Sequence, residues 1–265
     1  MVWRDHSRDY GKDLSLTVPL DVAASGTVTA TSGASYAVGT LASESIGALF
    51  GSDMATSALS ATATPLPTTL GGVSVELRDG AGVNRSAPLF YVSPTQITFQ
   101  VPAGSSSGAA TLRVTRGGTV VGQGSLTIDS VTPGLFTANS DGRGVPAAIA
   151  IRAKTNGVQT DEPVLQLNTA TNRFEPVALD LGEASDQLIL VAFGTGFRQR
   201  TSLGNVSATI GGVAADVLFA GPQGGLVGVD QLNVRIPRSL AGRGSVDVVL
   251  TVDGKRANAV TIQIK

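Results

Sequence analysis

The chain of 265 residues has no cysteine and only one histidine, His6. Without cysteine it cannot form disulfides, thiolate nucleophiles or cysteine-ligated metal centres. A single histidine excludes any metal site with two histidine ligands, and every Ser-His-Asp scheme would depend on His6. We therefore predict no catalytic residues, no bound metal and no cofactor, and expect a protein that is not an enzyme.

Charge is also scarce. Charged residues make up 15% of the chain, with 19 basic and 20 acidic side chains and a net charge of −1, against about 25% charged residues in ordinary globular domains. A nucleic-acid-binding protein needs a basic stripe, because neutralised phosphates dominate its affinity, and none is present. No apolar run approaches the ~18 residues of a transmembrane helix. We expect neither a nucleic-acid partner nor a membrane span.

The first residues, Met1 to His6, are polar and lack the apolar core of a secretory signal peptide. The composition nevertheless resembles that of secreted bacterial β proteins, because it is rich in Thr, Ser, Gly and Val and poor in Lys. We expect an extracellular or cell-surface protein whose secretion signal has been removed or lies outside this sequence.

From residue 27 onward, apolar and polar residues alternate with the period of two that is typical of strands. Gly117-Gly118 and Asp253-Gly254 supply hairpin turns between such runs. The best helical candidate, residues 42–58, contains two glycines and favours strand and loop instead. The sequence predicts an all-β fold, with its cleanest strand patterns at residues 73–77, 111–115, 125–128, 233–236, 246–252 and 260–264.

An internal repeat indicates how the chain is organised. Its matched segments are Phe50-Gly51 with Phe193-Gly194, residues 70–73 with 210–213, residues 96–102 with 231–237, and residues 108–114 with 244–250. The repeat predicts two homologous sandwich domains at residues 31–129 and 186–265. Between them, residues 130–185 are expected to form a β-rich connecting insert whose hairpins pack on the second domain. Residues 1–30 form an N-terminal arm.

Several longer stretches resemble a known family. They include Leu41–Ile46, Pro65–Gly72, Ala87–Ile97, Pro133–Ala138 and Val229–Pro237. Together they are similar to the uncharacterised C-terminal domain family that is abundant in acidobacterial secreted proteins and was first noticed in Solibacter. The resemblance covers about residues 31–265. It implies an extracellular protein with tandem immunoglobulin-like β-sandwich modules similar to IPT/TIG domains. That family has no assigned catalytic residues, so the resemblance implies none here.

Two glycine-rich stretches imitate catalytic or binding motifs. Residues 104–108 read Gly-Ser-Ser-Ser-Gly, which matches the G-x-S-x-G nucleophile elbow, but the elbow needs a following helix and a later histidine. Residues 142–147 loosely imitate a dinucleotide fingerprint, but Pro146 and the lack of a following helix favour a turn. We predict an inter-strand loop and a turn.

Oxygen-bearing side chains near residue 140 raise the possibility of calcium, which takes six to eight oxygen ligands. The candidates are Asn139, Asp141 and Asp161-Glu162, but they form no dense acidic run, so a solvated loop is the favoured interpretation. The other acids are scattered singly, and no pair suited to glycoside hydrolysis is visible in the sequence.

The charged arm, residues 1–22, lies outside the family resemblance. Within it Leu14, Leu16 and Val18 alternate with polar residues, so as a strand they would share one face. The arm is either a frayed terminus or a strand that adds to an open sheet edge. If it reaches another copy, the contact is head-to-tail and generates an open filament. Candidate assembly residues are Trp3, Tyr10, Leu14, Leu16 and Val18.

These observations favour a non-enzymatic extracellular structural protein that self-assembles head-to-tail into a surface filament through its N-terminal strand. The expected partner is the protein itself. Two alternatives stay open: a cell-surface adhesion module that binds a glycan or a protein, and accessory domains of a secreted hydrolase.

Overall fold

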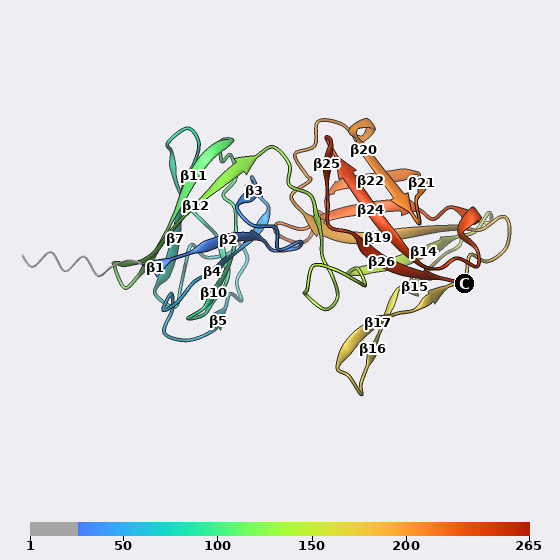
Figure 1. Cartoon of the computed structure of the whole chain (residues 1–265), viewed down its shortest axis with the longest axis horizontal. Coiled ribbons are helices and arrows are strands. Elements are labelled where there is room, and N and C mark those ends of the chain that lie inside the picture. The colour runs from blue at the N-terminus through green and yellow to red at the C-terminus, as the bar shows by residue number, and fades with distance from the viewer. Residues whose placement is uncertain (1–25) are drawn as a thin grey trace, which may run out of the picture.

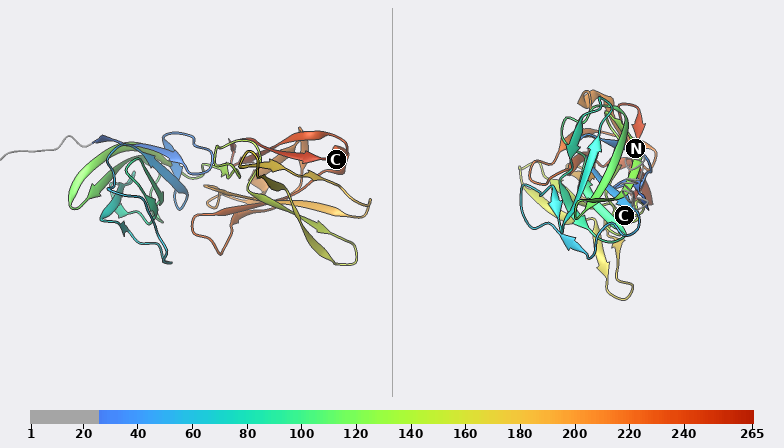
Figure 2. Two further views of the ribbon diagram at one scale, coloured as in Figure 1. Left: turned by 90° about the horizontal axis from the view of Figure 1, so that it is seen from below. Right: turned by 90° about the vertical axis from the view of Figure 1, so that its left-hand side faces the viewer.

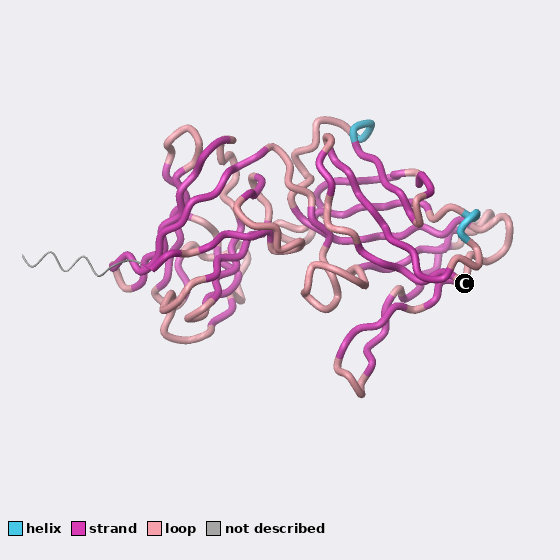
Figure 3. The backbone as a smooth tube through the Cα atoms, in the orientation of Figure 1, coloured by secondary structure: helices cyan, strands magenta, loops and turns pink. Residues whose placement is uncertain are grey.

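The computed structural model describes residues 26–265. Over this range it contains strands, turns and two short 3-10 helices, η1 (Leu203–Asn205) and η2 (Arg238–Leu240), and it has no α-helix. Figure 3 shows this predominance of strand along the backbone. The all-β prediction is confirmed.

Residues 26–129 form two sheets. The seven-stranded sheet contains β1 (Gly26–Thr27), β3 (Thr40–Ala42), β6 (Thr69–Leu70), β7 (Val73–Arg78), β8 (Asn84–Ser86), β11 (Gly108–Arg116) and β12 (Thr119–Asp129). The five-stranded sheet contains β2 (Thr29–Ser32), β4 (Ile46–Phe50), β5 (Leu59–Ser60), β9 (Leu89–Val92) and β10 (Gln96–Gln100).

Residues 134–264 form two six-stranded sheets and one hairpin. The first sheet contains β13 (Gly134–Leu135), β14 (Ala148–Ala153), β15 (Gln159–Pro163), β19 (Gln187–Thr195), β22 (Val217–Pro222) and β23 (Asp230–Arg235). The second contains β18 (Ala178–Leu179), β20 (Val206–Ile210), β21 (Val213–Ala215), β24 (Gly244–Val252), β25 (Lys255–Arg256) and β26 (Val260–Ile264). The hairpin pairs β16 (Leu165–Asn168) with β17 (Arg173–Pro176).

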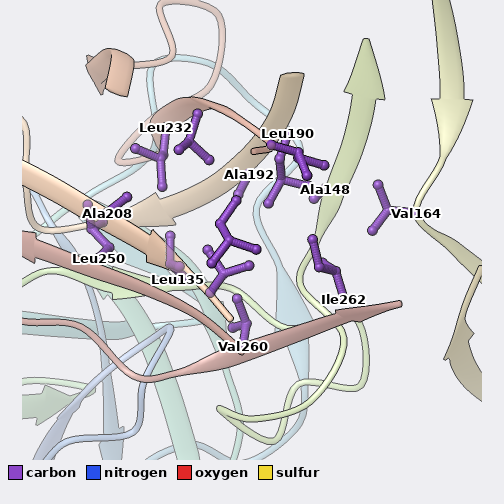
Figure 4. Close-up of a cluster of buried hydrophobic side chains, with 14 of the residues drawn as sticks. Leu135, Ala148, Val164, Leu190, Ala192, Ala208, Leu232, Leu250, Val260 and Ile262 are labelled. Carbon is purple, nitrogen blue, oxygen red and sulfur yellow. The ribbon is translucent and has the colours of Figure 1, made fainter. Parts of the chain in front are cut away.

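Each pair of sheets encloses its own hydrophobic core, because alternate residues of each strand point inward. In β7, for example, Val73, Val75 and Leu77 are buried while the residues between them are more exposed. One core draws on residues 28–128 and the other on residues 131–264. Figure 4 shows part of the second core. The arrangement is consistent with two β-sandwiches, which we call the first sandwich (residues 26–129) and the second sandwich (residues 131–264).

Figures 1 and 2 show the two sandwiches lying end to end along the long axis of the molecule. The strand β1 begins at the outer end of the first sandwich, and Lys265 ends the chain in the second. The β16–β17 hairpin projects from the second sandwich. The described part of the chain is therefore elongated, and its first and last residues lie in different sandwiches.

The two sandwiches pair their strands in the same order. The order β2–β4–β10–β9 in the first is matched by β14–β19–β23–β22 in the second. On the opposite sheets, β3–β12–β11–β7–β8 is matched by β18–β26–β24–β20–β21. In both cases the first strand of this series, β3 or β18, is parallel to its neighbour.

The pairing registers support most of the sequence repeat and correct one part of it. Phe50 lies opposite Gln96, as Phe193 lies opposite Gln231, so this match is confirmed. The match of residues 70–73 with 210–213 is wrong. The first Gly-Gly turn precedes β7, whereas the second follows β20, although β7 and β20 occupy the same place beside β11 and β24. Gly-Gly suits any tight hairpin turn, so it marks hairpins rather than equivalent positions.

Residues 130–185, predicted as a connecting insert, contribute directly to the sheets and core of the second sandwich. Strand β14 pairs with β19, and β18 pairs with β26. Val131, Leu135 and Val164 are fully buried in the second core. Three parts of this segment lie outside the strand order that the two sandwiches share: β13, β15 and the β16–β17 hairpin.

Candidate assembly site

The residues predicted to carry assembly, Trp3, Tyr10, Leu14, Leu16 and Val18, lie outside the described residues, as does His6. The described chain starts at β1, which runs parallel to β12 with Gly26 opposite Gly122. The Val28 amide continues this contact by donating to the Gln123 carbonyl at 2.9 Å. The described chain thus begins at the outer end of the first sandwich (Figure 2).

At its other end the first sandwich is joined to the second by a buried hydroxyl. The Ile46 amide donates to Thr195 Oγ1 at 2.9 Å, and Thr195 Oγ1 donates to the Gly228 carbonyl at 2.7 Å. Gly228 has a positive φ of 72°, and a Cβ there would come within 2.6 Å of the Ile46 side chain. Glycine is therefore required for this close approach, which locks β4 of one sandwich against the other.

A charged network lies beside this contact. Asp230 is fully buried and accepts hydrogen bonds from the Phe197 and Arg198 amides at 2.8 and 3.1 Å and from Arg198 Nε at 2.8 Å. Arg198 also lies 3.6 Å from the Glu44 carboxylate of the first sandwich, and Gln199 donates to Glu44 at 2.8 Å. The side chain that bridges the two sandwiches is thus held by a buried acid.

Burial raises the pKa of the Asp230 carboxyl above its ordinary value, because removing a carboxylate from water disfavours the charged form. The hydrogen bonds from the Phe197 amide and from Arg198, together with the Arg198 charge, pull in the opposite direction. A second ion pair, Lys255 with Asp129, connects the sandwiches at a more exposed place. The junction combines close packing, buried hydrogen bonds and ion pairs, so it favours one relative orientation.

The glycine-rich stretches are a loop and a turn, as predicted. Residues 104–108 connect β10 to β11, and the Ser105 hydroxyl donates to the Pro102 carbonyl at 2.7 Å. The neighbouring Ser106 amide donates to Asp79 at 3.1 Å, which ties this loop to the β7–β8 turn. Residues 142–147 form a turn before the strand β14.

Three of the calcium candidates, Asn139, Asp141 and Glu162, make contacts within the protein. Asn139 exchanges hydrogen bonds with the backbone of Phe174, and Asp141 forms an ion pair with Arg173 at 2.9 Å. Glu162 lies on β15 and binds Arg152 at 2.5 Å. In the range 26–265, no group of three or more His, Asp or Glu side chains could hold a metal ion. The structure does not bring these candidates together.

A polar hollow of about 520 Å³ lies at the junction. It is lined by Ser43, Gly104, Ser105, Ser106, Ser107, Asp129, Ser130 and Gln199. Hydroxyl, amide and carboxylate groups can bind polar ligands, but none of these lining residues is aromatic. The hollow therefore lacks the stacking surface on which sugar rings are often bound.

The junction between the sandwiches was not predicted from the sequence, although the repeat contains one signal of it. Asp230 precedes the matched segment 231–237 at the position where the first repeat has Thr95 before 96–102. A charged residue that replaces a neutral one beside a strand pattern indicates that the charge has a specific partner in the fold. The partners Glu44 and Arg198 are 154 residues apart in sequence, and only the fold brings them together.

In residues 26–265, no helix is long and apolar enough to cross a membrane. No family model matches the chain, and a search of curated proteins finds no similar one.

Proposed function

We propose that the chain is a non-enzymatic, extracellular structural protein of two immunoglobulin-like domains that assembles head-to-tail through its N-terminal strand. The observation that carries the proposal is the fixed junction between two sandwiches whose chain enters at the outer end of one of them. Such a unit favours one orientation of its two sandwiches, and the segment preceding β1 joins it at one end, which suits an open chain of copies.

The immunoglobulin-like part of the proposal is supported by the strand order. In the first sandwich β2 pairs with β4 of one sheet, and β3 lies parallel to β12 of the other. In the second sandwich β14 pairs with β19 of one sheet, and β18 lies parallel to β26 of the other. This switch of the first strands between sheets, together with the Greek-key order, is the arrangement of immunoglobulin-type sandwiches. The family resemblance in residues 31–265 leads to the same proposal independently.

The structural role is supported by the use of the polar residues. The buried charges Asp79, Arg152 and Asp230 each bind other groups of the same chain. These networks position loops and hold the junction. We propose that the function lies in association of whole molecules, with a cell-surface partner or glycan as the alternative role.

The test is electron microscopy of the purified full chain beside two single-lysine variants. Leu16→Lys places a charge on the apolar face of the predicted strand, whereas the matched control, Thr17→Lys, places the same charge on the opposite face. We expect polymers from the parent and from Thr17→Lys, and monomers from Leu16→Lys. A monomeric parent would overturn the filament proposal, and equal polymers from both variants would overturn the role of the strand.

A further inference from the structure

The strands β9 and β22 occupy the same place in the two sandwiches. Each is the last strand of the shared order, β2–β4–β10–β9 in the first sandwich and β14–β19–β23–β22 in the second. Val92 pairs with Ile97, as Ala220 pairs with Leu232. In both strands the pairing register then shifts by one residue, just after Tyr91 in β9 and just after Phe219 in β22 when each strand is followed backward. Tyr91 therefore corresponds to Phe219, and Leu89 to Val217. The two edges can be compared residue by residue.

The first sandwich covers this edge itself. Strand β5 pairs with β9, with Leu59 opposite Val92 and Ser60 opposite Tyr91, and the Ala61 amide donates to the Phe90 carbonyl at 2.8 Å. Ala61 packs against the first core. On the far side of β22, no strand among residues 26–265 makes the corresponding pairs.

The missing cover is visible in the exposure of the side chains. Leu89 is fully buried, whereas its counterpart Val217 is only half-buried. In place of the half-buried Tyr91, the second sandwich presents Phe219 with 37% of its surface exposed, and Leu218 beside it is 40% exposed. An uncharged six-residue edge with exposed apolar side chains is prone to pair with another strand.

The core behind this edge is also incomplete. Val213, Ala215 and Val217 pack against the second core but remain partly exposed. The other long edge of the same sheet, β15, carries Asp161 and Glu162, and charges protect edge strands against pairing. The described part of the chain therefore protects the β15 edge with charge, whereas β22 has no charged residue and its protection is limited to a register shift and the terminal Pro222.

The sequence of the arm matches that of the covering strand. Residues 59–62 read Leu-Ser-Ala-Thr, and residues 14–17 read Leu-Ser-Leu-Thr. We infer that residues 14–18 of a second copy of this chain pair with β22, in the place that β5 takes beside β9. Leu14 then lies opposite Ala220 and Ser15 opposite Phe219, while Leu16 covers the half-buried core. This inference rests on the proposed head-to-tail assembly and identifies the surface that accepts the arm.

The charge next to the arm strand fits this orientation. The β5–β9 pair is antiparallel, so the same arrangement places Asp13, which precedes Leu14, beside Gly221. The Arg200 guanidinium lies over Gly221, with Nη1 at 2.9 Å from where a Cβ would stand. Among the described residues Arg200 Nε is buried without a hydrogen-bond partner. An Asp13 carboxylate at this place supplies the missing acceptor.

The length of the arm favours a second copy over the same one. The arm is attached opposite Gly122, whereas Asp129, seven residues further along β12, lies at the junction, which is about 23 Å at the rise of a strand. In the inferred register Val18 lies near Val217, which is five residues, about 17 Å, beyond Pro222, and Pro222 pairs with the junction residue Asp230. Together these spans exceed the reach of about 28 Å for the eight residues from Val18 to Gly26.

Cysteine cross-linking tests the inference, because the chain has no cysteine of its own. One variant carries Ser15→Cys and the other Phe219→Cys. They are mixed under the conditions in which the parent polymerises, and are then oxidised. Opposite residues of an antiparallel pair lie within disulfide range. We expect a disulfide-linked dimer of the two variants. In the matched control, Tyr91→Cys replaces Phe219→Cys, and we expect only background linkage because β5 already occupies that edge.

The outcomes separate this inference from the proposed function. Polymers without the Phe219 cross-link, or with equal linkage to Tyr91→Cys, would overturn β22 as the acceptor but leave head-to-tail assembly intact. A chain carrying both Ser15→Cys and Phe219→Cys that closes within one monomer would overturn the second copy. A parent that stays monomeric by electron microscopy would overturn both.

Charge exchange tests the register independently. Asp13→Arg alone brings two positive charges together and is expected to weaken assembly, raising the protein concentration at which polymers appear in light scattering. Adding Arg200→Asp restores an opposite-charge pair and is expected to lower that concentration again. Failure of the second substitution to restore assembly, with both variants folded by circular dichroism, would overturn the placement of Asp13 beside Arg200.

Discussion

The two sandwiches share a strand order but differ at their edges. The first covers its β9 edge with β5, while the second leaves the equivalent β22 edge open and adds β15 and the β16–β17 hairpin elsewhere. The interiors of the two sandwiches are built alike, because in each the alternating apolar residues must fill the space between two sheets. The edges are free to differ, and edges are where another chain can pair. Differences in association should therefore be sought at the edges.

The largest expected effect comes from creating a cavity in one hydrophobic core while leaving the other core unchanged. Phe99 and Phe197 are the bulkiest fully buried side chains, one in each core. We expect Phe99→Ala and Phe197→Ala each to lower the free energy of unfolding of its own sandwich by about 3–5 kcal/mol. Amide hydrogen exchange, followed residue by residue, measures the two sandwiches separately. Equal loss of protection in both sandwiches from either substitution would show that the two cores unfold as one unit.

The next effect concerns the junction. Arg198→Met removes the cation that pairs with the buried Asp230 and reaches Glu44. Loss of one partner of a buried ion pair costs about 3 kcal/mol, measured by urea denaturation at neutral pH. The matched control is Arg235→Met, because Arg235 pairs with the exposed Asp216, and such a surface pair contributes about 0–1 kcal/mol.

The pH dependence of this variant has a definite sign. Burial already raises the pKa of Asp230, and removing Arg198 raises it further. A carboxyl whose folded pKa is above its unfolded pKa gains stability as the pH falls through the folded value. The cost of Arg198→Met should thus shrink on acidification. A cost that stays constant from neutral pH to pH values near 4 would contradict the role of Asp230.

The smallest effect at neutral pH concerns Asp79 in the first sandwich. Hydrogen bonds from the Ser106 amide, the Val83 and Ala81 amides and Arg85 lower its pKa to about 2, against the opposing effect of burial. A lowered pKa contributes stability that is fully present above the unfolded value of 3.8 and is lost as the pH falls toward 2. We expect acid to loosen the 104–107 loop over this range, measured by hydrogen exchange or NMR.

The control for this prediction is Asp79→Asn, which retains one hydrogen-bond acceptor but does not ionise. It should reduce the loss of protection between pH 4 and pH 2 in the first sandwich. It should leave the second sandwich unchanged, because Asp79 contacts only residues of the first. An unaltered acid response of the 104–107 loop would show that other carboxyl groups control it.

Much of the fold could be predicted because strands of this chain have alternating patterns and short turns. The pattern at residues 246–252 falls in β24, and Gly117 and Gly118 both adopt the positive φ angles of a tight hairpin turn. The Gly-Gly pairs also misled the alignment of the repeats, since they recur wherever a hairpin closes. The positions of β14 and β18 were harder to predict, because which sheet a strand joins depends on distant neighbours.

The candidate site could be predicted only in part. The alternating strand of Leu14, Leu16 and Val18 is a local pattern, and its structure and partner remain predictions. The acceptor edge β22 does not stand out in sequence, because Val217, Leu218 and Phe219 resemble any buried strand. Their exposure becomes apparent only when β9 is seen with its cover and β22 without one.

The sequence by itself determined the all-β class and most of the strand positions, because side-chain alternation and turn residues act over a few neighbouring positions. The tertiary structure decided which strands share a sheet, how Thr195 and Arg198 join the two sandwiches, and which edge is left without a partner. These features depend on contacts between residues that are far apart in sequence. Their energies come from burial and hydrogen bonding that exist only once the chain has folded.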